Sequence, residues 1–402
     1  MNVSSPEFIE NPYLFYQQRR EEAPIYRRDE HLWTITGYEE ASKVLANSAA
    51  GRGNIGQFPT QNSDTTKLDL IKSNNPVLQV LDKWMLFKNP PEHACMRKQL
   101  SDVFTIKMIY QLEGLMRETM VQLIADIKRQ TSNNSFDLVQ RIAYPFPIAV
   151  ICEMIGIPKQ DRNQFRQWTQ HFSIAVEKDF LLIPEDVKDA LNQSASELER
   201  YFKQLIPTKK REAKNDLMTR LINLSDGNLS EQEILANCVF LLFAGQDTTT
   251  CLIANTINAL IKNPDQFALL RSDPRLIKNA VEECLRYDPS IQMVGRYALD
   301  DIRETRIKRG DHMFVFLGAA GHDPIANPEP DKFDITRVNI KHLAFARGAH
   351  HCLGASLARL ELRVVLEELI KGFTALEFDG TGQRRGTWLM RGFDTLPLKY
   401  NV

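Results

Sequence analysis

Several patterns are scarce in this sequence, and each absence argues against a class of protein. Its 6 cysteines include no CxxC pair, which is the usual signature of a zinc module. The N-terminus has no apolar run long enough for a signal peptide or a membrane anchor. Because 50 basic residues balance 51 acidic ones, no global charge draws the chain to nucleic acid or to a membrane. We therefore expect a cytoplasmic protein that binds neither.

What is present is an ordinary globular composition, 43% hydrophobic and 25% charged, over 402 residues. That length suggests two or three domains but permits one large one. Apolar residues at helical spacing predict helices over 12–22, 108–129, 147–156, 161–175, 229–262, 275–287 and 353–372. Strand-like segments occupy 25–26, 32–36 and parts of 290–317. The pattern predicts a mainly α fold with small β-sheets, in the α+β class.

One cysteine stands in an unusual setting, the stretch FARGAHHCLG at residues 345–354. Cys352 comes directly before the helical pattern of residues 353–372, so we place it at a helix N-terminus, where the helix dipole favours a thiolate. Gly348 and Gly354 flank the sulfur and permit close approaches that a Cβ would block. The loop predicts a metal-bound thiolate that faces a flat, bulky ligand.

Two other interpretations of Cys352 stay open. A lone cysteine is most often a buried structural residue. A zinc site could use Cys352 with His350 and His351, but zinc needs four ligands and the remaining cysteines are scattered through apolar helical patterns.

The longest helical pattern opens with a capping box, Ser230 and Glu233, and stops at Asn263-Pro264. Its middle reads AGQDTTT, residues 244–250, in which glycine and threonines disfavour a helix. Such a patch is expected where a functional requirement overrides helix propensity. The alternative is an irregularity that the helix tolerates. Two charged pairs also lie at helical spacing: His93 with Arg97, and Glu283 with Arg286. Most pairs of this kind are solvated.

These segments together resemble the cytochrome P450 family of haem-thiolate monooxygenases. FARGAHHCLG resembles its cysteine loop, F-G-x-G-x-H/R-x-C-x-G, with Ala346 where glycine is usual. AGQDTT resembles its dioxygen-binding motif, PPEHACMR resembles P-P-D/E-H-x-x-x-R, and Glu283 with Arg286 fits E-x-x-R. GAAGHDP departs from the usual A-A-N-R-D-P at Gly321 and His322. The resemblance runs from about Asn11 to the C-terminus.

The resemblance implies one P450 domain over residues 1–402, of the soluble bacterial type. This fold is a helix-rich prism that holds haem b between a long central helix and the cysteine loop, with Cys352 as axial thiolate and metal ligand. Asp247 and Thr248 would form the catalytic proton relay. The other implied haem-binding residues are His93, Arg97, Ala244, Gly245, Arg296, Phe345, His350 and Gly354. The implied structural supports are Glu283, Arg286 and Arg337.

The implied reaction is a monooxygenation. Two electrons from outside would activate dioxygen, and a lipophilic molecule such as a fatty acid, terpenoid, steroid or polyketide would be hydroxylated or epoxidised. Because the length leaves no room for a flavin or iron–sulfur module, the expected donor is a ferredoxin or flavodoxin with its reductase. We expect it to dock on a monomer near a basic set, Lys98, Arg347, Arg359 and Arg363.

The substrate pocket is the least determined part. Its apolar candidates are Leu242, Ile291, Met293, Val294, Trp388 and Leu389. Arg391 would either anchor a substrate carboxylate or lie on the surface. Residues 51–75 would cover the substrate, and 172–185 would form a lid. Two alternatives remain for the function: a P450-type enzyme of another reaction, such as carbon–carbon coupling, desaturation or peroxygenation, and a haem-based gas sensor.

Overall fold

The computed structural model describes residues 5–53, 71–130, 133–177, 180–212, 214–224 and 229–401. It is 61% helical with small sheets, which confirms the predicted class. The chain divides into two compact units. Unit 1 comprises Met1–Ala50, Tyr110–Pro147 and Thr248–Val402, and unit 2 comprises Gly51–Ile109 and Ile148–Asp247. In the described part of the chain, no helix is both long enough and apolar enough to cross a bilayer.

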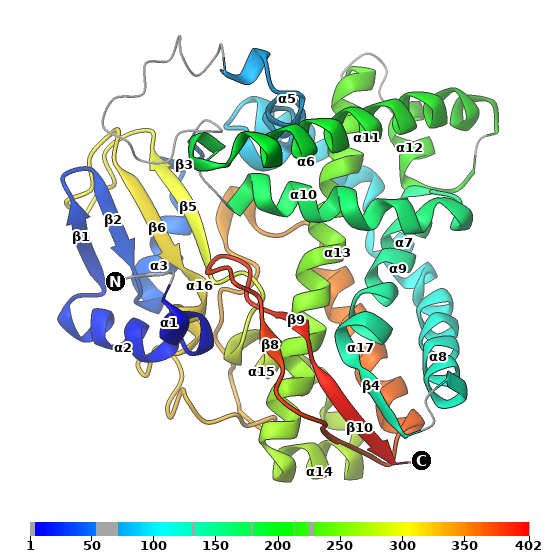
Figure 1. Ribbon diagram of the computed structural model, residues 1–402. Helices are drawn as coiled ribbons and strands as arrows, with labels where there is room; N and C mark the ends of the chain where they lie inside the picture. The colour runs from blue at the N-terminus through cyan, green and yellow to red at the C-terminus, as the bar shows by residue number, and fades with distance from the viewer. Residues whose placement is uncertain are drawn as a thin grey trace. The chain divides into compact units, whose positions relative to one another are not determined.

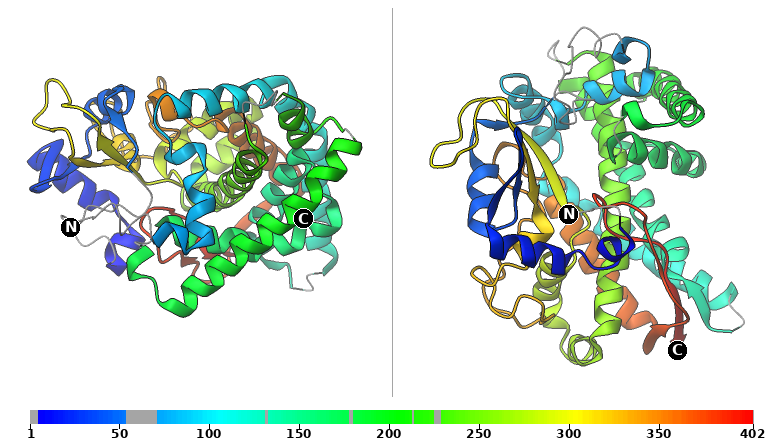
Figure 2. Two further views of the ribbon diagram at one scale, coloured as in Figure 1. Left: turned by 90° about the horizontal axis from the view of Figure 1, so that it is seen from above. Right: turned by 60° about the vertical axis from the view of Figure 1, so that its left-hand side comes forward.

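Unit 1 contains the largest sheet, in the order β1-β2-β6-β5-β3. Its strands are β1 Ile25–Asp29, β2 Leu32–Ile35, β3 Ala50–Gly51, β5 Met293–Ala298 and β6 His312–Phe316. Strand β2 pairs parallel with β6, with Leu32 opposite His312, while β5 runs antiparallel to β6. Figures 1 and 2 show β1 and β2 beside the two later strands, although they are far apart in sequence. Apolar side chains such as Trp33, Ile35 and Val315 form its core.

The other elements of unit 1 are mainly helices. They are α1 Pro6–Glu10, α2 Tyr13–Glu22, α3 Tyr38–Ala46, α8 Glu113–Gln130, α14 Pro264–Ser272, α15 Ile277–Tyr287, α16 Leu317–Gly321 and α17 Ala355–Gly372. Small sheets are formed by β4 Ser135–Asp137, β7 Ala375–Phe378 and β10 Pro397–Asn401, and by β8 Gln383–Arg384 with β9 Phe393–Thr395. Helices α7 Ile106–Gln111 and α9 Pro145–Ile155 cross the boundaries between the units. The single helix predicted over 108–129 is thus interrupted at Leu112.

Apart from Gly51 at the end of β3, the regular elements of the described part of unit 2 are helices. Its elements are α5 Pro76–Asp82, α6 Glu92–Val103, α10 Phe165–Glu177, α11 Glu185–Arg211 and α12 Leu217–Leu224. Helices α10 and α11 lie side by side in Figure 1 and in both views of Figure 2. Trp84 is fully buried and packs among the rings of Phe172, Phe240 and Phe243.

Helix α13, Glu231–Lys262, is the longest helix described and confirms the predicted one. Its capping box is formed as expected: Glu233 N donates to Ser230 Oγ over 3.2 Å, and Ser230 N donates to the Glu233 carboxylate over 2.8 Å. Residues up to Asp247 belong to unit 2, and those from Thr248 belong to unit 1. The polar stretch at 51–75, predicted to cover a substrate, lies mostly outside the described residues.

Candidate functional site

The cysteine loop of unit 1 is closed by its own backbone. Cys352 N donates to Phe345 O over 2.9 Å, and His351 N donates to Gly348 O over 3.0 Å. Cys352 is exposed, whereas four of the other five cysteines are buried. This exposure argues against the structural-cysteine interpretation, because such thiols are usually buried. Cys352 is in a position to bind a partner from outside the chain.

Two residues of this loop have left-handed backbone conformations. Gly348 has φ +74°, and a Cβ there would lie 2.2 Å from Leu45 O, so glycine is required. Ala346, the departure from the family pattern, has φ +54°. The usual glycine adopts that conformation at no steric cost, whereas alanine pays about 1–2 kcal/mol. Alanine at this position therefore strains the loop.

The relation of Cys352 to the following helix differs slightly from the prediction. Helix α17 starts at Ala355 with Gly354 as its N-cap, so Cys352 precedes the cap by two residues. Gly354 has φ −83°, and a Cβ on it would make an ordinary contact of 3.9 Å with the Cys352 sulfur. Glycine is thus required by the fold at Gly348, whereas at Gly354 the need for glycine beside a ligand stays a prediction.

The middle of α13 has one open face. Within the buried run of residues 241–250, only Ala244, Gly245 and Thr248 are partly exposed. They lie at positions i, i+1 and i+4, which share one face of a helix. Gly245 has a second role, since a Cβ there would come within 3.0 Å of Ile151 Cδ1 on α9. Close packing of α9 on α13 therefore explains the glycine without a ligand.

Two buried carboxylates, Asp247 within this segment and Glu361 in contact with Thr249, each accept a hydrogen bond from a hydroxyl group. Within unit 2, Ser173 Oγ donates to Asp247 Oδ2 over 2.6 Å, and both side chains are buried. Within unit 1, Thr249 Oγ1 donates to Glu361 Oε2 over 3.3 Å, and burial raises the pKa of Glu361 well above its ordinary value. Sequence reasoning found Asp247 but missed Ser173 and Glu361. Both are polar residues on apolar helix faces, which was the available signal.

The predicted propionate partners are basic and mostly buried. His93 and Arg97 lie one turn apart on α6 of unit 2, where His93 is 2% exposed. Arg296 lies on β5 of unit 1, is 4% exposed, and donates to Gly295 O over 2.9 Å. A buried guanidinium such as that of Arg296 is costly to desolvate and favours an anionic ligand, and the His93 ring and the Arg97 guanidinium can also donate hydrogen bonds, so these side chains suit carboxylates.

The predicted support network is present in unit 1. Glu283 accepts two bonds from Arg286, at 2.7 and 2.8 Å, and one from Arg337 at 3.4 Å. Glu283 and Arg286 are fully buried, and Arg286 also donates to the carbonyl oxygens of Gly321 and Pro330. These bonds fix the end of α15 against the segment that follows α16.

The same contacts explain the departure at Gly321 and His322. A Cβ at Gly321 would lie 2.4 Å from Arg286 O, so only glycine fits there. The ring nitrogens of His322 lie 2.8 Å from Asp331 Oδ1 and from Tyr287 O. The ring also stacks on Tyr13 at a centroid distance of 3.9 Å. His322 therefore has a structural role in the core, where the usual family sequence has a different residue.

The candidate pocket residues fall into two groups. Leu242 is fully buried, and Met293 belongs to a core cluster with Phe8 and Tyr16. Both are buried in the core, and their contact with a substrate stays a prediction. The partly buried members, which stay available, are Ile291, Val294, Trp388 and Leu389.

Both interpretations of Arg391 are wrong. Its side chain is 7% exposed and donates to Asp288 over 2.7 Å and to the carbonyl oxygens of Ile9 and Glu10. Tyr13 donates to the same Asp288 carboxylate over 2.6 Å. Arg391 thus ties α1 and α2 to the C-terminal part of unit 1.

The predicted lid at 172–185 comprises the end of α10, a short 3₁₀ turn at Phe180–Leu182 and the start of α11, with 178–179 outside the described residues.

The basic residues proposed for docking are largely paired within the chain. Arg359 forms two bonds with Glu282, at 2.6 and 2.9 Å, and Arg363 bonds Glu113 over 2.7 Å. Arg347 donates to Ser42 Oγ. Lys98 is exposed on α6. The neighbouring carboxylates reduce the positive potential of Arg359 and Arg363. A substitution of Lys98 is therefore the better test of whether a redox partner docks here.

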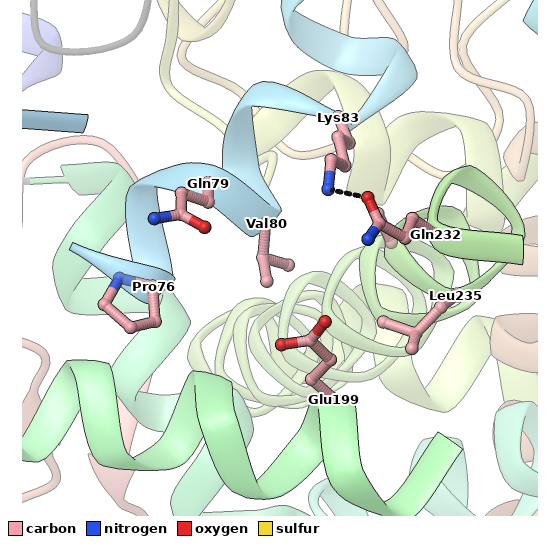
Figure 3. Close-up of a pocket in the computed structure, with 8 residues that line it drawn as sticks. Pro76, Gln79, Val80, Lys83, Glu199, Gln232 and Leu235 are labelled. Carbon is pink, nitrogen blue, oxygen red and sulfur yellow. Dashed lines mark hydrogen bonds between the residues drawn. The ribbon is translucent and has the colours of Figure 1, made fainter. Parts of the chain in front are cut away.

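Unit 2 contains a small hollow lined by none of the predicted site residues (Figure 3). Lys83 donates to Gln232 Oε1 over 2.7 Å across it. The volume, about 20 Å³, has room for about one water molecule. Its lining includes Pro76, Gln79, Val80 and Glu199. It is too small and too polar to hold an organic substrate.

Comparison with known proteins matches the chain to a family model described as Cytochrome P450, over residues 69–387. A biotin biosynthesis cytochrome P450 of Bacillus subtilis (strain 168) is 33% identical over 406 residues, covering 99% of this chain and 98% of that protein. Cytochrome P450 monooxygenase PikC of Streptomyces venezuelae is 32% identical over 408 residues, covering 98% of this chain and 92% of PikC.

A solved structure shows the same fold at similar identity. P450BioI in complex with acyl carrier protein ligated to hexadec-9Z-enoic acid has a TM-score of 0.89 and 31% sequence identity, with 100% of both chains covered. The match over the full length of both chains extends the likeness beyond the motifs to the whole fold.

Proposed function

The chain belongs to the cytochrome P450 family and is a haem-thiolate monooxygenase, and we propose that Cys352 is the residue that holds its haem b. The observation that carries this proposal is the exposed thiol of Cys352 in a closed loop ahead of α17. Among the described residues, no three His, Cys, Asp or Glu side chains lie together as in a protein-built metal site. One thiolate suits a metal whose other ligands come from a macrocycle.

Bound haem supplies reductive activation of dioxygen, with the overall balance RH + O₂ + 2 e⁻ + 2 H⁺ → ROH + H₂O. The chain's own part is to deliver the two protons. We assign this to Asp247, which accepts a proton on its carboxylate, and to Thr248, whose hydroxyl passes it on toward the open face of α13. Thr248 is partly exposed on that face with Ala244 and Gly245, which supports the assignment.

His93, Arg97 and Arg296 would hold the two haem propionates. Each side chain can donate charge-assisted hydrogen bonds, and His93 and Arg296 are removed from bulk water, which strengthens such bonds. Phe345, His350 and Gly354 would border the cofactor as parts of the cysteine loop. The support network of Glu283, Arg286 and Arg337 would hold the fold without touching it.

The substrate we propose is a lipophilic molecule, such as a fatty acid, terpenoid, steroid or polyketide. The partly buried apolar side chains of Ile291, Val294, Trp388 and Leu389 support this class. The fatty acyl chain named for the P450BioI complex belongs to it as well. That acyl chain is carried by a protein, so both a free acid and a carrier-bound acyl chain should be screened.

Members of this family take an organic substrate, dioxygen and electrons from a redox partner. We propose a ferredoxin or flavodoxin with its reductase as the donor, docking on a monomer at a surface that includes Lys98. A cytoplasmic location remains a prediction. Peroxygenation, desaturation and carbon–carbon coupling would differ from monooxygenation in the fate of labelled dioxygen, since only monooxygenation places one ¹⁸O atom from ¹⁸O₂ in the product.

The first test is the absorption spectrum of the reduced protein under carbon monoxide. A Soret band strongly shifted to the red identifies thiolate-ligated haem, and Cys352→His should move it to the position of histidine-ligated haem. Cys95→Ser is the matched control, because Cys95 is the other exposed cysteine. A variant at Cys352 with the unchanged red-shifted band would disprove the ligand assignment.

The proton relay is tested by Thr248→Ala with dioxygen as the only electron acceptor, so no substrate has to be known. Reduction to water consumes four electrons per dioxygen, and release as hydrogen peroxide consumes two. General acid catalysis typically contributes about 10²-fold or more, so peroxide should become the main product. An unchanged ratio of peroxide to water would remove Thr248 from the relay, and a haem sensor without turnover would consume almost no electrons.

A further inference from the structure

A hydrogen bond between two helices of unit 2 is explained by none of the sequence motifs. Ser173 on α10 donates from Oγ to Oδ2 of Asp247 on α13, over 2.6 Å. Both side chains are 5% exposed. A buried carboxylate is costly unless hydrogen-bond donors compensate for lost water, and short hydroxyl-to-carboxylate bonds are among the stronger ones. The hydrogen bond from α10 therefore replaces part of the hydration that the Asp247 carboxylate loses on burial.

The contacts on the buried face of α10 indicate that the Ser173 hydroxyl donates to Asp247 and not to its own helix. Phe165, Trp168, Thr169 and Phe172 precede Ser173 at helical spacing on the same face. Thr169 satisfies its own hydroxyl within the helix, by donating to Phe165 O over 2.9 Å. The corresponding contact from Ser173 to Thr169 O is longer, at 3.3 Å. A serine hydroxyl has one proton, and the geometry directs it to the carboxylate.

We propose that Ser173 is a positioning residue for the proton relay, a proposal that rests on the role assigned to Asp247 above. By donating to Oδ2, Ser173 fixes the orientation of the carboxylate that takes up and releases the relayed proton. The Ser173 proton stays on Oγ throughout, so the relay gains and loses one proton per transfer. Because the donor belongs to α10, displacement of that helix would disturb the relay directly.

The test is Ser173→Ala in the haem-loaded enzyme, with dioxygen as the only acceptor and an added ferredoxin and reductase. Loss of one hydrogen bond to a charged group should raise the ratio of peroxide to water about tenfold. Ser173→Thr keeps the hydroxyl and should restore the ratio. Thr169→Val is the matched control, since Thr169 lies one turn away and bonds only its own helix among the contacts described. It should leave the ratio unchanged.

A double-mutant cycle with Asp247→Asn separates positioning from a general packing effect. If Ser173 acts through the carboxylate, Ser173→Ala should change the peroxide ratio little further in the Asp247→Asn background. The same cycle on the urea midpoint of unfolding, measured without turnover, should also be non-additive. Ser173→Ala with the normal ratio, or with its full effect in the Asp247→Asn background, would overturn the proposal. If Asp247→Asn alone leaves the ratio of peroxide to water unchanged, the proton relay itself would be disproved.

Discussion

At the scale of single residues, the cysteine loop contains a strained alanine. Ala346 has φ +54°, a conformation that glycine adopts freely. Replacing it by glycine removes about 1–2 kcal/mol of steric strain but adds flexibility to the unfolded chain, which costs about 0.4–1 kcal/mol. We expect Ala346→Gly to raise the thermal midpoint of the haem-loaded protein slightly, with its carbon monoxide spectrum unchanged.

The contrasting variant is Gly348→Ala. Its φ of +74° and the close approach of Leu45 O leave no room for a methyl group, so this variant should lose stability and haem. Equal midpoints for the two variants would show that backbone strain does not control the loop.

The residues that the sequence revealed are those carried by short local motifs. Cys352, Asp247 and Thr248 could be proposed as site residues because the motifs that contain them are continuous in the sequence. Ser173 is 74 residues from the carboxylate it contacts, and Glu361 is 112 residues from Thr249. Neither has a local signal beyond a polar residue on an apolar helix face. Arg391 was misjudged for the same reason, since its partner Asp288 is 103 residues away.

At the scale of elements, α15 and α17 are joined by a polar cluster that depends on pH. Although burial raises it, hydrogen bonds from His342 and Arg359 lower the pKa of Glu282 to about 2. Its ordinary value is 4.5, so the charged form is favoured in the folded state. This stabilisation is complete above about pH 4.5 and is lost as the pH falls toward 2.

We therefore expect Glu282→Gln to lower the free energy of unfolding at pH 7. The side chain is 32% exposed, so the loss should be about 1–2 kcal/mol after allowing for solvent screening. Urea unfolding at pH 7 and at pH 4 checks this, because the difference between variant and wild type should shrink at the lower pH. A difference that does not depend on pH would mean that packing, and not charge, joins the helices.

Helix boundaries were predicted well where the sequence contains explicit stops. Helix α13 begins with its capping box and ends before Asn263-Pro264, as expected. The break at Leu112 between α7 and α8 was missed, because the apolar spacing continues across it and the nearby Gly114 lies inside α8. The five-stranded sheet could not be derived either, since β2 pairs with β6 across about 280 residues and period-2 patterns do not identify partners.

At the scale of the molecule, unit 1 joins segments from both ends of the chain. Arg391 bonds Asp288 and the carbonyl oxygens of Ile9 and Glu10, so one guanidinium group holds α1 in place. Arg391→Lys keeps the charge but cannot reproduce this fork of donors. We expect limited proteolysis to cleave near α1 sooner in this variant. Arg275→Lys is the control, because Arg275 is exposed and bonds only Asp273 among the described contacts.

The position of Arg391 also bears on the order of events during synthesis. Domains begin to fold as they leave the ribosome, N-terminal parts first. Helix α1 is synthesised before its anchor, which is 382 residues further on. Until Arg391 has been made, the hydrogen bonds that hold α1 cannot form. The nascent chain must therefore keep α1 from other partners over the synthesis of 382 residues.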